Sequence, residues 1–445
     1  MDEILKFLAY FFLSLIEFSG NPANSNNKNT LNFNVSKEEP KYLYFNENQV
    51  NRFYTLNHQE LYWFPLNRES ILRRKSFKSQ LDSSRQLGLD KDKYNYQVIA
   101  QHCDDLFLRE DSIRAMQMDR IFTDIAFKFG LDIYRGAEMA NWMNSDEISP
   151  DFKMSEESHV IYELMEMGKG IDMNRYISSL EPEDSSYRIL KSCLKKILDS
   201  SDLARVIKLS TSLNQYRWIH HFSLDKFIIV NIPSATLTYW ESDTGKLKMK
   251  VVLGKPSTRT PRFAAYCDKV ILFPYWNVPH KIAVDEYLPI FRKSPEMVSS
   301  MNMQILDKQG KIIPEDSINW SLYSKSYFPY RIRQSTGCDN ALGVIKFNLT
   351  SPFDVYLHDT NMKSAFKSDY RFYSHGCIRL EKPFELANYL LTNPLDTAML
   401  NSGLKVQNPK TVALPKPVPV FVVYMSAEVV DGDIKFYPDV YKLLD

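Results

Sequence analysis

The spacing of apolar residues divides this chain into two parts that follow different periods. From Phe53 to about Leu213, apolar side chains recur every three or four residues, which is typical of amphipathic helices. The clearest pattern runs from Asp111 to Gly130, and this glycine is expected to end the helix. A second helix is predicted from Ile189 to Leu198. The first half of the chain is therefore expected to be helical.

Near Trp218 the pattern changes to short runs of apolar and β-branched residues, which predict strands. The expected strands are residues 227–232, 235–240, 247–253, 270–273, 344–347, 355–358, 418–424 and 434–437. Turns are expected at Asp243–Gly245 and at Asp431–Gly432. The fold class is therefore α+β, with a helical domain at residues 41–213 and a β-rich domain at residues 214–445.

Residues 281–330 interrupt the predicted strands with helical patches and few strand signals. Long insertions in compact domains often act as lids or substrate-binding elements, so we expect an inserted lid here. A surface excursion without function is the alternative.

The N-terminus combines an apolar run with a polar stretch. Residues 5–16 are mostly apolar, which suits a signal peptide or an N-terminal anchor at residues 1–20 better than a full membrane span. Asp2 and Glu3 are atypical of an export signal, so a buried N-terminal helix is the alternative. Residues 21–40 are polar and predict a flexible linker.

The amino-acid composition and the lack of certain motifs argue against several classes of protein. The net charge of +1 gives no strong attraction to nucleic acid. No glycine-rich phosphate-binding pattern is present, which argues against a nucleotide enzyme. The five cysteines are Cys103, Cys193, Cys267, Cys338 and Cys377, and none forms a C-x-x-C pair, which argues against a zinc ribbon or a thioredoxin motif.

The candidate chemistry lies near the C-terminus, where fifteen residues separate His358 from the run Ser374-His-Gly-Cys377. A thiol is mostly protonated at neutral pH and needs a base, and histidine suits that role. We therefore predict Cys377 as nucleophile and His358 as base. Gly376 permits a tight turn, and the N–H groups of His375, Gly376 and Cys377 would bind an oxyanion. A backbone carbonyl near Asp359 would orient the imidazole.

Two other interpretations of these residues stay open on spacing alone. A lone cysteine among strands is often a small core residue. A His-x-Cys pair with a second histidine upstream could also bind zinc and leave an open coordination position.

Longer motifs resemble one known family. The run from Tyr356 to Thr360, followed by Tyr373 to Arg379, is similar to the signature of the L,D-transpeptidases, whose catalytic domain is of the YkuD type. Further runs resemble the large, scaffolded branch of that family: residues 254–261, 273–279, 330–334, 340–347, 214–218 and 417–424. Residues 40–200 resemble its helical scaffold more weakly. The small peptidoglycan-binding domain common in this branch is absent, and Cys338 stands where the branch usually has proline.

The resemblance implies an activity and a substrate. Cys377 would attack the third residue of a peptidoglycan stem tetrapeptide and release D-Ala, and His358 would shuttle the proton. An amine of an acceptor stem would resolve the thioester as a 3→3 cross-link. The family is acylated by carbapenems and acts outside the cytoplasm, so a periplasmic enzyme is expected, anchored to the inner membrane if its N-terminus is retained. No cofactor, metal or nucleic acid is implied.

Further residues are expected to support this chemistry. Ser374, His375 and Gly376 would shape the turn and the oxyanion site. The candidates for substrate binding are Arg379, Tyr356, Trp276 and Asn340. An arginine suits a substrate carboxylate through paired hydrogen bonds, although a structural ion pair is the alternative.

Three other functions are compatible with the same sequence. With water as acceptor the enzyme would be an L,D-carboxypeptidase, and with a protein lysine it would anchor a protein to the wall. A non-catalytic cell-wall-binding scaffold is the alternative from another class, although the intact Cys377 and His358 argue against it.

Overall fold

The computed structural model describes residues 42–105, 112–137, 150–168, 172–337, 339–396, 398, 400 and 408–444. Contacts divide the chain into a helical unit, Met1–Ser223 with Ala427–Phe436, and a β-rich unit, Leu224–Ser426 with Tyr437–Asp445. This agrees with the predicted α+β class. The expected signal peptide or anchor, the linker at residues 21–40 and Cys338 lie outside the described residues. In the described part, none of the helices has the length and hydrophobicity that crossing a membrane requires.

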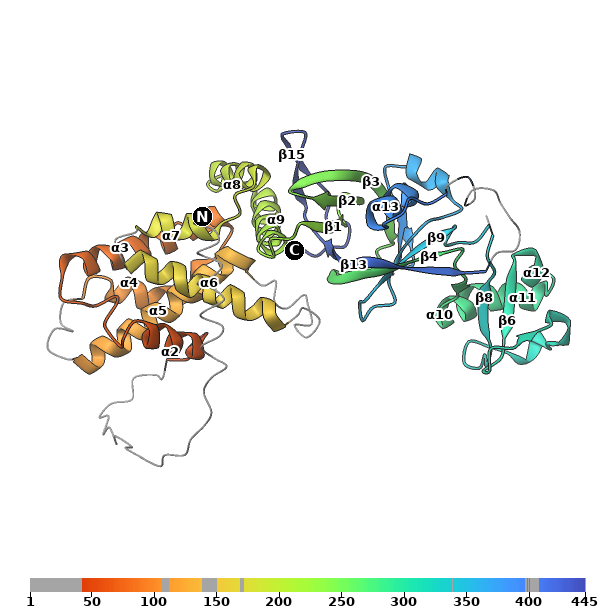
Figure 1. Ribbon diagram of the computed structural model, residues 1–445, viewed down its shortest axis with the longest axis horizontal. Coiled ribbons are helices and arrows are strands. Elements are labelled where there is room, and N and C mark those ends of the chain that lie inside the picture. The colour runs from red at the N-terminus through yellow and green to blue at the C-terminus, as the bar shows by residue number, and fades with distance from the viewer. Residues whose placement is uncertain are drawn as a thin grey trace, which may run out of the picture. The chain divides into compact units, whose positions relative to one another are not determined.

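The helical unit is built from amphipathic helices, which run from red to yellow-green in Figure 1. They are α2 (Glu47–Leu56), α3 (Arg68–Asp82), α4 (Tyr96–His102), α5 (Ser112–Arg135), α6 (Pro150–Gly168), α7 (Met173–Leu180), α8 (Ser185–Ile197) and α9 (Leu203–His220). Two short 3₁₀ helices, η2 (Ser84–Leu87) and η3 (Lys91–Tyr94), separate α3 from α4. At the centre, the buried carboxylate of Asp119 accepts the N–H groups of Trp63 at 2.7 Å and Phe64 at 2.8 Å.

The prediction that Gly130 ends a helix is wrong, because α5 continues to Arg135. Gly130 is a packing position: a Cβ atom there would lie 2.1 Å from the hydroxyl of Tyr176 and 2.9 Å from Val160 Cγ1. The helix instead stops before Gly136, whose φ of 82° leaves the helical region.

The predicted domain boundary at residues 213/214 falls inside α9 and is also wrong. This helix runs on to His220, and the first strand starts at Lys226. The buried Arg217 holds the last turns in place, since it donates to the carbonyl oxygen of Leu87 at 2.7 Å and to the hydroxyl of Tyr187. The change of period near Trp218 therefore marks the end of a helix and not the start of a strand.

The β-rich unit contains a nine-stranded sheet in the order β11-β3-β12-β10-β9-β4-β13-β1-β2, which closes because β2 also pairs with β3. Its strands are β1 (Lys226–Asn231), β2 (Thr236–Glu241), β3 (Thr244–Gly254), β4 (Phe263–Leu272), β9 (Ile345–Leu349), β10 (Leu357–His358), β11 (Phe372–Ser374), β12 (Ile378–Leu380) and β13 (Lys410–Val423). The same unit contains the helix α13 (Pro383–Leu390) and the 3₁₀ helix η9 (Lys363–Lys367).

The two faces of this sheet differ in chemistry. Along β9, Ile345, Phe347 and Leu349 point into the apolar core, so the alternate Lys346 projects to the other face. The same alternation puts Leu357 of β10 and both Ile378 and Leu380 of β12 in the core. The opposite face of these strands therefore receives the polar residues.

The insertion between β4 and β9 has a small core and sheet of its own, coloured teal in Figure 1. Its sheet has the order β5-β8-β6-β7, with β5 (Trp276–Asn277), β6 (Met303–Leu306), β7 (Ile312–Ile313) and β8 (Arg331–Gln334). Its helices are α10 (His280–Ile282), the π-helix η6 (Ala283–Tyr287), α11 (Leu288–Lys293), α12 (Met297–Ser300), η7 (Glu315–Ser317) and η8 (Trp320–Leu322). These strands were not predicted from the sequence because each has two to four residues, too few for a visible alternation.

A C-terminal hairpin returns to the helical unit. Strands β14 (Ala427–Val430) and β15 (Asp433–Phe436) pair with each other. The N–H of Ala427 donates to the hydroxyl of Ser212 in α9 at 3.0 Å, and the guanidinium of Arg205 lies 5.1 Å from the ring centroid of Phe436. The last strands of the sequence therefore do not all belong to the β-rich unit.

Candidate active site

Cys377 lies at the end of a tight turn, Ser374–Cys377, that joins β11 to β12. Gly376 has a φ of 121°, a conformation that strains any residue with a Cβ atom. The hydroxyl of Ser374 closes the turn, because it donates to the carbonyl oxygen of Cys377 at 2.6 Å and accepts the N–H of Gly376 at 3.1 Å. The turn thus presents the thiol from a fixed backbone.

One of the three predicted oxyanion donors is already occupied. The N–H of Gly376 is bonded to Ser374, so the prediction that this group binds an oxyanion is wrong. The N–H groups of His375 and Cys377 form no hydrogen bond with any described residue. These two remain the candidate donors.

The segment 254–261, which follows β3, holds the turn. The N–H of Lys255 at 3.0 Å and the hydroxyl of Thr258 at 3.2 Å both donate to the carbonyl oxygen of Ser374. The buried hydroxyl of Thr260 donates to the carbonyl oxygen of Gly376 at 2.8 Å. The sequence indicated this segment through its family resemblance but gave no role to its threonines.

Gly254 and Tyr441 fix the position of the segment 254–261. Gly254 has no room for a side chain, since a Cβ atom would lie 2.2 Å from the carbonyl oxygen of Thr258. The hydroxyl of Tyr441 donates to the carbonyl oxygen of Gly254 at 2.6 Å and accepts the N–H of Thr260 at 3.2 Å. The C-terminal end of the chain therefore supports the turn at the thiol.

His358 lies at the end of β10, and its ring is buried. Its Nδ1 is 2.5 Å from the carbonyl oxygen of Asp359, and because a carbonyl can only accept, Nδ1 carries the proton. Burial, together with the positive charges of Arg379 and Lys346, lowers the pKa of His358 from 6.5 to about 3. The imidazole is therefore neutral at physiological pH, with Nε2 able to accept a proton.

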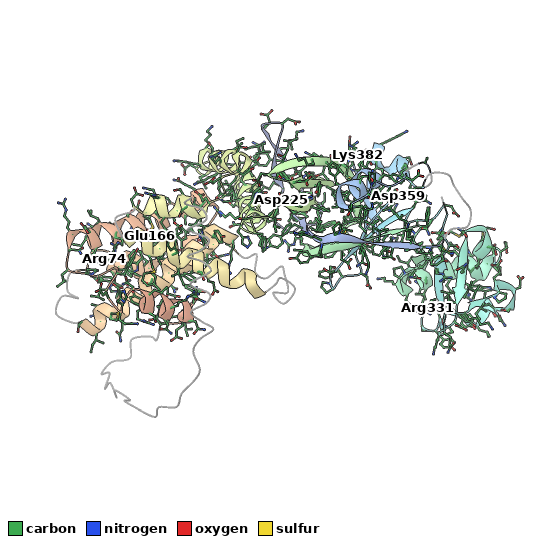
Figure 2. The ribbon with its side chains drawn as sticks, viewed as in Figure 1. Arg74, Glu166, Asp225, Arg331, Asp359 and Lys382 are labelled. Carbon is green, nitrogen blue, oxygen red and sulfur yellow. The ribbon has the colours of Figure 1, made fainter. Side chains whose placement is uncertain are left out.

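Asp359, labelled in Figure 2, is fixed by its own side chain. Its carboxylate accepts the N–H of Val344 at 3.0 Å and forms an ion pair with Lys363. Gly343 makes this approach possible, since a Cβ atom there would lie 2.2 Å from Asp359 Oδ2. The expectation that a backbone carbonyl near Asp359 orients the imidazole agrees with this geometry.

The thiol of Cys377 is half-buried and donates to the carbonyl oxygen of Asp354 at 3.6 Å; among the described residues it forms no hydrogen bond with the imidazole. Burial raises the pKa of this thiol. Hydrogen bonds from Tyr356 and the charges of Lys346 and Arg379 lower it by less. The resting pair is therefore a neutral thiol beside a neutral imidazole.

The imidazole and the thiol share one face of two neighbouring strands. His358 pairs in parallel register with Arg379, and the N–H of Ile378 donates to the carbonyl oxygen of Tyr356 at 3.1 Å. Residues two positions apart on a strand project from the same face. His358, Tyr356, Arg379 and Cys377 therefore meet on the polar face of the sheet.

Three of the four predicted substrate-binding residues reach this face. The ring of Tyr356 is 5.6 Å from that of His358 between centroids, and its hydroxyl lies close enough to the thiol and to Trp276 for both groups to shift its pKa. The half-buried Arg379 contacts Met362 Sδ at 3.7 Å and interacts electrostatically with the thiol. Burial lowers the pKa of Arg379 without removing its charge at neutral pH.

Asn340 is not a substrate-binding residue, because its side chain is fully buried. Its amide donates to the carbonyl oxygens of Pro274 at 3.1 Å and Ser335 at 2.7 Å, and its oxygen accepts the N–H of Leu342 at 2.7 Å. Pro274 precedes the insertion and Ser335 follows it. Asn340 therefore holds together the two segments of the chain that enter and leave the insertion.

Replacing Asn340 by alanine should lower the free energy of unfolding by about 2–4 kcal/mol, because three buried backbone groups lose their partner. Denaturant unfolding would measure it. Asn361→Ala is the matched control, since its exposed amide donates to one carbonyl, of Asp339, and its loss should cost about 0.5 kcal/mol. Equal effects in both variants would contradict this role of Asn340.

His375 connects the turn to the insertion. Its Nε2 lies 2.6 Å from a carboxylate oxygen of Glu286, which belongs to the π-helix η6. The two residues are 89 positions apart, and sequence reasoning missed the contact because nothing local to either residue signals it. The turn that carries Cys377 and the insertion are thus linked by a hydrogen bond to a carboxylate.

The three residues considered as zinc ligands do not converge. His375 is directed to Glu286, and the Nδ1 of His358 is bonded to the carbonyl oxygen of Asp359. In the described part of the chain, no group of three or more histidine, cysteine or acidic side chains could hold a metal ion.

Comparison with known proteins identifies two domains. The family model of the YkuD L,D-transpeptidase catalytic domain matches residues 225–420, and a Scaffold domain model matches residues 48–194. The curated "Putative L,D-transpeptidase" of Haemophilus influenzae is 34% identical over 268 residues, which are 60% of this chain and 54% of the relative. The chain thus spans about half the length of that relative.

The solved structures are similar to a smaller part of this chain, and at lower sequence identity. An L,D-transpeptidase from Mycobacterium smegmatis is 18% identical over 45% of this chain and 58% of that chain, with a TM-score of 0.23. L,D-transpeptidase 3 from Mycobacterium tuberculosis is 14% identical over 45% of this chain and 61% of that chain, with a TM-score of 0.22. Residues 225–420 therefore form a catalytic domain of the YkuD L,D-transpeptidase type, and residues 48–194 form a scaffold domain.

Proposed function

We propose that this chain forms 3→3 cross-links in peptidoglycan through a thioester on Cys377, with release of D-Ala. The observation that carries the proposal is a buried, neutral His358, fixed by the carbonyl oxygen of Asp359, on the strand beside the turn that presents Cys377. The substrates would be a donor tetrapeptide stem and an acceptor stem, as the family implies. No cofactor takes part in this scheme.

The first half-reaction acylates the enzyme. Rotation of the Cys377 side chain about χ1 would move the sulfur from the carbonyl oxygen of Asp354 toward Nε2 of His358. The imidazole takes the thiol proton while a bond forms between the sulfur and the carbonyl carbon of the third stem residue. The N–H groups of His375 and Cys377 bind the resulting oxyanion. The C–N bond to D-Ala then breaks, and His358 returns the proton to the leaving amine.

The second half-reaction resolves the thioester. The side-chain amine of the third residue of an acceptor stem, usually a diamino acid, enters as a neutral nucleophile, and His358 takes its proton. A C–N bond forms, the C–S bond breaks, and the thiol is regenerated. With water in place of the amine the product would be a tripeptide, and with a protein lysine it would be a wall-anchored protein.

Other residues on the same face would bind the substrate. Arg379 would hold a stem carboxylate, and Tyr356 with Trp276 would line the cleft. The insertion would act as the lid, joined to the turn by the Glu286–His375 hydrogen bond. Since the family acts on peptidoglycan peptides, the site of action would be the periplasm.

Incubation with a purified disaccharide-tetrapeptide tests the proposal, with products read by mass spectrometry. A dimer joined through the third residues supports transpeptidation. Tripeptide alone would indicate an L,D-carboxypeptidase, and a product attached to a protein lysine would indicate anchoring. Unchanged substrate, and no adduct with a carbapenem, would favour a non-catalytic wall-binding protein.

Glu286→Gln should slow cross-linking by about tenfold and acylation by less than about threefold. The neutral amide weakens a charge-assisted hydrogen bond that holds the lid beside the turn, and the acceptor stem depends most on that lid. Both rates are measurable with the same disaccharide-tetrapeptide. Glu296→Gln, which changes an exposed carboxylate elsewhere in the insertion, is the control. An equal loss of both rates would mean that the contact serves only to position the turn.

A further inference from the structure

Two positive charges flank the imidazole on the polar face of the sheet. His358 pairs with Lys346 of β9 on one side and with Arg379 of β12 on the other. Side chains of directly paired residues project from the same face and lie close together. Lys346, His358 and Arg379 therefore form one row across three strands.

Lys346 faces the reacting group and not the solvent. Its ammonium lies 3.9 Å from the ring centroid of Tyr356, a cation–π contact that fixes its direction. The hydroxyl of the same tyrosine lies near the thiol of Cys377, which contributes to raising the pKa of that hydroxyl. The lysine and the thiol therefore share Tyr356 as a neighbour, and burial lowers the pKa of the half-buried Lys346.

Neither cation has a counter-ion within ion-pair distance among the described residues. The exposed Asp354 acts on Lys346 through space without forming an ion pair, and the carboxylate of Asp359 is taken by Lys363. Lys269, on the adjacent β4, is paired with Asp268 at 3.4 Å. Unpaired charges that are partly removed from water are costly, and such groups are usually compensated by a bound partner.

A count of charges indicates what that partner is. With neutral thiol and imidazole, the two cations leave the site at +2, apart from the exposed Asp354. In the tetrahedral intermediate the oxyanion is balanced by the imidazolium that forms when His358 takes the thiol proton, so the charges of Lys346 and Arg379 stay uncompensated. A bound anion would offset them. In a donor stem that ends at the leaving residue, the C-terminal carboxylate is one residue beyond the attacked carbonyl, which makes it the anion nearest to the bond that breaks.

We propose that Lys346, together with Arg379, binds the free C-terminal carboxylate of the leaving residue and so selects donor stems that end one residue after the attacked carbonyl. This inference rests on the proposed function of the site. Lys346 is a specificity-determining residue in this scheme. A donor that continues beyond the leaving residue, or ends in an amide, lacks the required charge.

The test compares acylation of Cys377 by two donors, a tetrapeptide ending in D-alanine and the same peptide ending in D-alaninamide. The wild-type enzyme should prefer the free acid by about 10- to 100-fold in kcat/KM, the range expected for a charged hydrogen bond. Lys346→Met should reduce this preference to about threefold or less, mainly through KM for the acid. Lys346→Arg should restore most of it, since the charge is kept.

Two controls separate this role from others. Lys269→Met removes a charge from a neighbouring strand, where the lysine is ion-paired, and should leave the preference unchanged. Alkylation of Cys377 by iodoacetamide measures the separate effect of the lysine charge on the thiol pKa. A loss in Lys346→Met that is equal for both donors and for iodoacetamide would mean that the lysine acts only on the thiolate. An unchanged preference in Lys346→Met would overturn the inference. A wild-type enzyme that accepts neither donor would overturn the proposed function itself.

Discussion

Cys377→Ala is expected to abolish covalent acylation by a carbapenem and to leave the fold intact. The proposed mechanism depends on one sulfur atom, because the bond that forms in the first half-reaction is a thioester. The turn itself depends on the hydroxyl of Ser374 and the φ of Gly376, not on the thiol. Intact-mass spectrometry should show one carbapenem added to each wild-type chain and none added to the variant.

The other described thiols provide the controls for this experiment. Burial raises the pKa of Cys267 to about 12, so its thiolate is scarce at neutral pH. Cys193 is half-buried on α8, and Cys193→Ala should acylate as the wild type does. An adduct that persists in Cys377→Ala would assign the nucleophile elsewhere. No adduct on the wild type would point to a wall-binding protein that has kept the fold.

The nucleophile and the base of the proposed mechanism could be named from the sequence because their signals are local. The run Ser374–Cys377 contains both the residue that closes the turn and the glycine that permits it, so the turn forms from neighbouring residues. His358 is carried by the adjacent strand, which the apolar alternation already indicated. The carbonyl oxygen that fixes its ring belongs to the next residue.

Residues whose roles depend on strand register could not be found in this way. Lys346 becomes part of the site only because β9 pairs with β10 so that it lies opposite His358. A shift of one residue would turn it into the core. Asn340 shows the reverse case: it stands in a family-like run, yet its three buried hydrogen bonds give it a structural role.

Tertiary packing also overrode local preference in the helical unit. Gly130 has the sequence character of a helix end, but it lies where Tyr176 and Val160 approach α5 too closely for any larger residue. Close approach also explains Gly254 near the site, and at Gly343 it acts together with a φ of 59° that favours glycine. Sequence alone does not distinguish these two uses of glycine.

His358→Gln is expected to keep the fold and to slow acylation by at least about a hundredfold, the scale usual for loss of a general base. Glutamine can still donate a hydrogen bond to the carbonyl oxygen of Asp359, so the strand should stay in register. Circular dichroism and the rate of adduct formation with a carbapenem would measure the two effects. A rate within about threefold of the wild type would remove His358 from the mechanism.

The pH dependence of acylation and alkylation distinguishes a neutral thiol–imidazole pair from a thiolate–imidazolium ion pair. Because the folded pKa of His358 is about 3, its protonation should not limit acylation between about pH 5 and 8. The raised pKa of Cys377 should instead make the rate of alkylation climb throughout this range. A plateau of that rate from about pH 6 upward would indicate a preformed thiolate–imidazolium pair.

Stability should respond to pH in a way that identifies the same residue. Between about pH 6.5 and 3 the unfolded chain binds a proton at His358 that the folded chain does not, so the wild-type protein loses stability as the pH falls through this window. His358→Gln lacks that proton uptake and should lose less over the same interval. His102→Gln is the matched control, because its partly exposed ring is hydrogen-bonded to Asp105 at the surface of the helical unit. Equal acid sensitivity in the wild type and His358→Gln would mean that the buried imidazole is not held neutral, and the proposed thiol–imidazole pair would fail with it.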